Sequence, residues 1–236
     1  MTPEEREFRM LERITPSLID KMNKRHTAEG GTAINEKLDL LFSTFPDNTC
    51  PNDVQVKVAV LNTIYNTSIK YILPVARKIN AEFKVLGKRQ KGIKVSPIDM
   101  VDRIATAEWV SEESGKVIVR TNLSFASKYM HFESKRDVPI YDSYIWIIMN
   151  GYLHAAGDRV TFGAPCNYAD FYARFQQFRQ RFHLDGYSNY QIDKFLWQYG
   201  KAKISGYRKE GMSMANAKAR LQTELLKARL GSMQTQ

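Results

Sequence analysis

The sequence predicts an all-α protein. Apolar residues recur every three or four positions over long segments, and the alternating apolar and polar runs that are typical of strands are scarce. The chain has 236 residues, of which 43% are hydrophobic and 11% aromatic, which is sufficient for a sizeable core. We therefore predict one helical domain over residues 1–205 and a basic helical extension over residues 206–236.

Apolar spacing, prolines and N-cap residues set the order of the predicted elements. The N-terminal helical segment is interrupted near Pro16, and Asp53 and Ser96 are expected to cap later helices. One short strand is expected at residues 116–119. A further helix begins at about residue 124 and is stopped by Pro139, and the predicted helix 54–79 contains a polar break at 62–68. The other predicted helices cover residues 8–22, 33–45, 97–110, 143–153, 168–182, 190–201 and 213–230.

The charge pattern favours a polyanionic partner. The sequence has 35 Lys and Arg residues against 25 Asp and Glu residues, a formal net charge of +10. From residue 171 to the end, twelve basic residues stand against four acidic ones. An upstream loop without acids adds Lys84, Lys88, Arg89, Lys91 and Lys94. Such a loop suits phosphate contacts, although charge alone fits a solvated basic surface equally well.

The composition argues against several other classes of protein. No apolar run approaches the roughly 18 residues that span a bilayer, and the first residues, MTPEEREFRMLERI, are charged. We therefore expect a cytoplasmic protein without a membrane partner. Cys50 and Cys166 lack the spacing of a disulfide framework or a zinc site, and His131 and His154 lack metal-ligand spacing. Neither a metal nor a cofactor is expected.

A proline-containing turn sets one acidic residue in front of a very apolar helix, in the stretch KRDVPIYDSYIWIIMN. Pro139 fixes its own φ and favours an extended conformation for Val138, so Asp142 is expected at the N-terminus of the next helix. The helix dipole stabilises a negative charge there. A rigidly placed carboxylate can serve as a cap, worth about 1 kcal/mol, or as a chemical group.

The stretch DVPIYDSYIWII resembles the helix-hairpin-helix DNA glycosylase superfamily, in which a proline turn places a catalytic aspartate at the start of an apolar helix. The stretch AVLNTIYNTSIKYIL is similar to a second element of that superfamily, whose polar residues reach the lesion. The resemblance covers about residues 53–153. It implies a helical glycosylase core, catalysis by Asp142, and contacts with an extruded base or its partner by Asn62, Thr63, Tyr65 and Asn66.

Two departures from the superfamily shape the remaining expectations. The hairpin usually holds closely spaced glycines that bind a phosphate, but EESGKVIVRTN contains only Gly115, so phosphate contacts are expected from Lys116, Arg120 or the basic loop with Lys88, Arg89 and Lys91. Members that also cut the strand carry a lysine where this sequence has about Leu123. Lys128 lies further along. Either the enzyme uses only Asp142 and water, or Lys128 reaches the same catalytic pocket from a different turn of the helix.

These residue types suit cleavage of an N-glycosidic bond. The sugar acquires oxocarbenium character as the base departs, and a fixed carboxylate stabilises that charge and orients water. The nucleotide must leave the stack of double-stranded DNA, and Tyr65, Asn66, Tyr129 and Tyr141 are available to receive it. The sequence therefore predicts a DNA glycosylase acting on a modified base, with modified phage DNA as one possible substrate.

Two alternatives from other classes stay open at this point. A non-catalytic DNA- or RNA-binding module shares the positive charge and has no need of Asp142, which would then only cap its helix. Lys128 would face solvent, and Asn62 and Asn66 would simply end one helix and begin another. A helical interaction protein of a defence or toxin system would instead dock its basic tail on an acidic partner.

Overall fold

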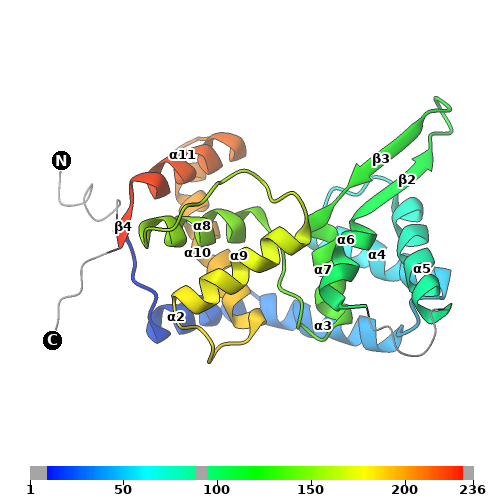
Figure 1. The fold of residues 1–236 in the computed structure, drawn as a ribbon, viewed down its shortest axis with the longest axis horizontal. Helices are drawn as coiled ribbons and strands as arrows, with labels where there is room; N and C mark the ends of the chain where they lie inside the picture. Colours follow the sequence, from blue (N-terminus) through cyan, green and yellow to red (C-terminus); the bar gives the residue numbers. More distant parts are fainter. Residues whose placement is uncertain (1–9, 89–94, 231–236) are drawn as a thin grey trace. The chain divides into compact units, whose positions relative to one another are not determined.

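Residues 10–88 and 95–230 are described by a computed structural model, and they are mainly helical, which confirms the predicted all-α class (Figure 1). Four short strands form two two-stranded sheets. In the described residues the strands are β1 (Met10–Leu11), β2 (Thr106–Val110), β3 (Val117–Thr121) and β4 (Arg229–Leu230). The helices are α2 (Pro16–Ala28), α3 (Gly31–Thr44), α4 (Pro51–Tyr65), α5 (Ile72–Lys88), α6 (Pro97–Ala105), α7 (Leu123–Glu133), α8 (Ser143–Ala155), α9 (Tyr168–Arg181), α10 (Asn189–Lys209) and α11 (Met214–Lys227).

The chain divides into two compact units, each built from segments that are not contiguous in the sequence. Unit 1 consists of Met1–Gly30, Asp142–Pro165 and Ala173–Gln236, and unit 2 consists of Gly31–Tyr141 and Cys166–Tyr172. The boundary predicted at residue 206 lies inside α10, because that helix runs without interruption from Asn189 to Lys209. The division therefore differs from one domain with a C-terminal extension.

Unit 1 is organised around α8, which is buried from Ile145 to Leu153. Helices α10 and α11 pack against it, and α2 packs on α10. Gly200 permits the close approach of α10, because a Cβ atom there would lie 2.9 Å from Cβ of Tyr144. In unit 1, β1 and β4 pair in parallel. The apolar sequence after Asp142 thus becomes the centre of this unit.

Unit 2 holds α3 to α7 and an antiparallel hairpin of β2 and β3. Its core contains a buried polar network in which Oδ1 of Asn48 accepts from Nζ of Lys57 at 2.5 Å and from the hydroxyl of Tyr129 at 2.5 Å. Desolvation lowers the pKa of Lys57, and the nearby carboxylate of Glu133 opposes that change. The charge of Lys57 also lies 5.1 Å from the ring centre of Phe42. This network ties the loop before α4 to α7.

Several predicted element boundaries are wrong. Asp53 does not cap α4, because Pro51 occupies the first turn and the N-cap is Cys50; Asp53 instead lies in the first turn, where the dipole favours it. The segment expected as helix before Pro16 contains β1, and α2 begins at Pro16 with Thr15 as its cap. Helix α10 continues to Lys209 rather than ending near residue 201.

The predicted helix 97–110 ends early, at Ala105, and residues 106–110 form β2. Its partner β3 overlaps the strand expected at 116–119. Cross-strand pairs such as Trp109 with Ile118 favour the hairpin over a longer helix, because aromatic and β-branched residues pack well on a pleated surface. Gly115, with φ of 63°, makes the turn. The stretch compared with a glycine-rich helical hairpin is therefore part of a β-hairpin.

Candidate functional site

The extended segment at residues 138–141, between α7 and α8, is held in place within unit 2 by side chains of two helices. The hydroxyl of Tyr168 donates to the carbonyl of Pro139 at 2.5 Å, and Nδ1 of His131 lies 2.7 Å from the carbonyl of Val138. The backbone N–H of Tyr141 donates to Oγ of Ser127 at 3.0 Å. These contacts fix the chain up to the residue before Asp142.

Asp142 is the N-cap of α8, as the sequence predicts. Its backbone is extended, with φ of −140° and ψ of 149°, and its Oδ1 accepts from the backbone N–H of Tyr144 at 2.8 Å. An acceptor side chain at this position satisfies one of the backbone N–H groups that have no partner within the first turn of the helix. The carboxylate is thus held at the start of α8 by its cap bond.

Within unit 1, Tyr144 links this cap to α10 and α11. The hydroxyl of Tyr144 donates to Sδ of Met214 at 3.4 Å, and Nζ of Lys218 lies 5.4 Å from the centre of its ring. Burial raises the pKa of Tyr144, the charge of Asp142 raises it further, and the charge of Arg208 lowers it. The acidic cap and two cations are therefore neighbours of one tyrosine.

Lys128 is buried in α7, with 4% of its surface exposed, rather than facing solvent. Its Nζ donates to Oγ of Ser124 at 2.5 Å and lies 5.4 Å from the ring centre of Tyr65. The hydroxyl of Tyr65 donates to Oδ1 of Asn35 at 2.9 Å. The structure thus brings together two of the predicted residues, Lys128 and Tyr65, within unit 2.

Asn62 holds the loop after α4, Asn66 ends that helix, and Thr63 bonds within it. The amide of Asn62 donates to the carbonyl of Ile69 at 3.0 Å and accepts from the backbone N–H of Ile69 and the hydroxyl of Thr67. Asn66 ends α4 in the left-handed conformation, with φ of 47°. The hydroxyl of Thr63 donates to Ala59 in the same helix. Within unit 2 the side chain of Asn62 therefore stabilises the polar break itself.

The predicted phosphate-binding residues that the structure describes lie in the β2–β3 hairpin and at the end of α5. Lys116 lies in the β2–β3 turn and Arg120 in β3, and both are exposed. Lys88 is the last residue of α5. Arg89 and Lys91 lie outside the described residues.

A surface hollow of about 620 Å³ lies in unit 2 between the end of α3 and the end of α7. Its walls include Phe42, Phe132 and Glu133, together with the ion pair between Arg136 and Asp39. Among the described residues, no predicted site residue lines this hollow. It therefore gives no support to the predicted base contacts.

Sequence reasoning missed the side chains that hold the segment before Asp142. Ser127 and His131 are four residues apart and lie on one face of α7, where both are buried. Polar residues at this spacing in an apolar helix were the available signal. Tyr168 gives no such signal, because in the sequence it is only the first residue of the predicted helix 168–182. The sequence shows that Arg208 and Lys218 are basic but does not place them beside Tyr144.

The described residues contain neither a metal-binding cluster nor a membrane-spanning helix. In residues 10–88 and 95–230, no group of three or more His, Cys, Asp or Glu side chains could hold a metal ion. Within the same ranges, every helix is too short or too polar to cross a membrane.

The chain is thus a mainly helical protein of two units, in which the hydrogen-bonded segment at residues 138–141 precedes the N-cap residue Asp142. The chain belongs to the HI_0787_N family, whose model, described as an N-terminal domain, matches residues 17–137. The match ends before Asp142. No curated protein and no solved structure matches the chain with significance.

Proposed function

We propose that this protein is a DNA glycosylase related to the helix-hairpin-helix superfamily and hydrolyses the bond between a modified base and deoxyribose. Asp142 is its catalytic carboxylate. The observation that carries the proposal is the fixed position of this group, whose Oδ1 caps α8 at 2.8 Å after a segment held by Ser127, His131 and Tyr168.

A fixed carboxylate is suited to this reaction because the charge develops on the sugar only in the transition state. A group that is already oriented stabilises the oxocarbenium without reorganising, and one such interaction is typically worth about 100- to 1000-fold in rate. The same carboxylate orients the water that attacks the sugar.

Lys128 is the second catalytic candidate, for a strand-cutting activity. An amine attacks the sugar carbon only when neutral, and the Schiff base so formed is reduced by borohydride to a stable protein–DNA adduct. Its buried position and its hydrogen bond to Ser124 suit a restrained amine. A trapped adduct that disappears in Lys128→Gln would assign a lyase step, whereas base release without an adduct assigns simple hydrolysis.

The central test is base release from damaged and phage-modified duplex DNA by the wild type and by Asp142→Asn. Asparagine is as good an N-cap as aspartate, so the substitution removes the charge while preserving the helix start. We expect base release to fall at least about 100-fold. Asp99→Asn is the matched control, because Asp99 is an exposed carboxylate in the first turn of α6 and should be neutral for activity.

A second candidate function is non-catalytic nucleic-acid binding. It is favoured by Asn62, whose amide is engaged on both sides by the loop at Thr67 and Ile69 rather than being reserved for a base. On this alternative the protein binds DNA or RNA in a salt-dependent way, releases no base, and binds equally well as Asp142→Asn. Activity that survives in Asp142→Asn would also refute the proposed mechanism.

A further inference from the structure

We propose that Arg208, Lys209 and Lys218 form a phosphate-binding surface on α10 and α11, which contacts the DNA backbone beside the nucleotide that Asp142 acts on. These three residues are called the α10–α11 basic surface below. This inference rests on the proposed function for the identity of the nucleotide, but its contact with DNA is tested separately. It assigns a role to the basic C-terminal part of the chain.

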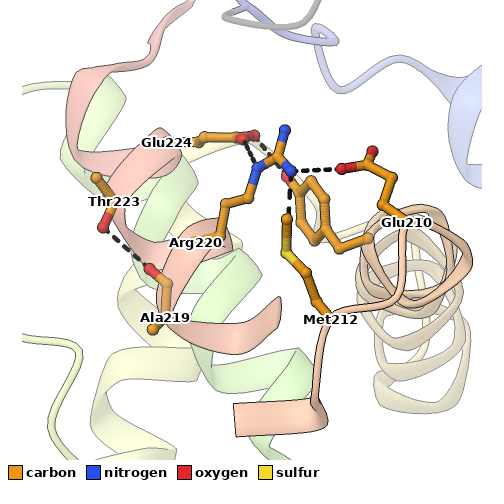
Figure 2. A network of polar contacts seen from close by, with 7 residues as sticks. Glu210, Met212, Ala219, Arg220, Thr223 and Glu224 are labelled. Atoms are coloured by element: carbon orange, nitrogen blue, oxygen red, sulfur yellow. Dashed lines mark hydrogen bonds and ion pairs between the residues drawn. The ribbon is translucent and has the colours of Figure 1, made fainter. Parts of the chain in front are cut away.

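Arg220 pairs with the two acids that could otherwise neutralise the cations of this surface (Figure 2). From residue 194 to the end, the sequence contains only two acids, Glu210 and Glu224. Nη1 of Arg220 lies 2.6 Å from Oε2 of Glu210, and Nε of Arg220 donates to Oε1 of Glu224 at 2.9 Å. One arginine therefore engages both acids of this region.

The same cluster fixes α11 relative to α10 within unit 1. The guanidinium of Arg220 lies 4.6 Å from the ring centre of Tyr207, and the hydroxyl of Tyr207 donates to Glu224 at 2.5 Å. The hydrogen bonds to Glu210 and then Glu224 raise the pKa of Arg220, so the guanidinium keeps its charge. Cations on the two helices are thus held at a constant spacing.

Arg208, Lys209 and Lys218 are left available for an external anion. Arg208 is exposed and donates one hydrogen bond, from Nη1 to the carbonyl of Met212 at 3.0 Å. Lys209 is exposed, and Lys218 lies over the ring of Tyr144. In the described part of the chain no carboxylate forms an ion pair with any of the three.

The surface adjoins the proposed catalytic carboxylate within unit 1. Tyr144 donates its backbone N–H to Asp142 and places its ring beneath Lys218, and the charge of Arg208 also acts on its hydroxyl. Phosphates flank every deoxyribose, so cations close to a carboxylate that acts on the sugar fit the adjacent phosphates. Unpaired Lys and Arg residues are the groups that proteins use for such contacts.

The test measures binding of a fluorescent DNA duplex that carries a stable abasic-site analogue, at salt concentrations between about 50 and 200 mM. The variant is Arg208→Gln with Lys218→Gln. Two lost phosphate contacts should lower the slope of log affinity against log salt by about two and weaken binding about tenfold or more. The matched control is Lys21→Gln with Lys24→Gln, which removes the same charge from exposed positions on α2.

Each outcome decides one question. A reduced slope in the Arg208/Lys218 variant, with an unchanged slope in the control, supports the surface. Equal slopes in both variants, or no DNA binding by the wild type, overturn it. Base release is scored on the same proteins, so a wild type that binds through this surface but releases no base refutes the glycosylase proposal while leaving the phosphate contact in place.

Discussion

The close approach of α10 to the start of α8 gives a prediction that links packing to the candidate site. In Gly200→Ala the new methyl group would lie 2.9 Å from Cβ of Tyr144 and 3.1 Å from Cγ1 of Ile148. Both atoms lie near the backbone of α8, and Cα of Tyr144 is only 3.5 Å away, so the helices must separate. Such overpacking costs about 1–3 kcal/mol.

Helix propensity partly offsets this cost, because alanine is more favourable than glycine inside a helix by about 1 kcal/mol. The net expectation is a loss of about 1 kcal/mol, measured from urea unfolding followed by far-UV circular dichroism. Movement of Tyr144 also shifts the N–H that holds Asp142, so base release should fall by more than the loss of folded protein explains. This second readout separates a positional effect from simple destabilisation.

Two other glycines supply the controls. In Gly206→Ala, in the same helix, the new methyl group meets no atom within 4 Å, so the variant should gain stability from propensity alone. In Gly151→Ala it meets Cδ2, Cδ1 and Cγ of the buried Leu225 at 2.6, 2.8 and 3.0 Å, so this variant should lose stability by a clash away from Tyr144. Gly200→Ala should therefore be less stable than Gly206→Ala. A Gly200→Ala variant as stable as Gly206→Ala would refute the reasoning.

Two predictions concern pH. The hydrogen bonds of Lys201 and then Arg25 lower the pKa of Glu29 from 4.5 to about 2, so Glu29 stabilises the fold above pH 4.5 and this contribution is lost as the pH falls towards 2. Because Glu29 is about one-third exposed, solvent screens its ion pairs with Lys201 and Arg25. Glu29→Gln should therefore lower the free energy of unfolding by only about 1 kcal/mol at neutral pH. In thermal melts the difference in stability between the variant and the wild type should vanish at about pH 2. Burial lowers the pKa of Lys57 below 10.5, so the folded state loses this proton at a lower pH than the unfolded state does. The free energy of unfolding of the wild type should therefore rise relative to that of Lys57→Met as the pH rises towards 10.5. A fall of the wild type relative to the variant over that range would contradict the prediction.

Local patterns were sufficient to predict the helix that follows Asp142. Pro139, the acidic residue and the apolar run are adjacent in the sequence, and the N-cap depends on interactions over two residues. The hairpin of β2 and β3 could not be read in the same way. Residues 106–110 continue a helical spacing from α6, and only pairing with residues 117–121 decides between helix and strand.

The roles of individual polar residues depend on contacts with residues that lie outside a short sequence motif. The resemblance to the glycosylase superfamily implies base contact by Asn62, but its amide is engaged by Thr67 and Ile69 because the chain turns back after Asn66. The side chains that hold residues 138–141 come from α7 and from Tyr168. Contacts over such separations are not encoded in a short motif, so the rigidity before Asp142 could be seen only in three dimensions.

The family match and the proposed chemistry fall on different parts of the chain, and this affects how each can be tested. The matched residues, 17–137, include α2 of unit 1 and most of unit 2. Asp142 and the α10–α11 basic surface both belong to unit 1 and lie after the match. An activity found in another member through the matched domain would therefore bear on Lys128 and Tyr65, whereas the carboxylate and the phosphate contacts need variants of this chain.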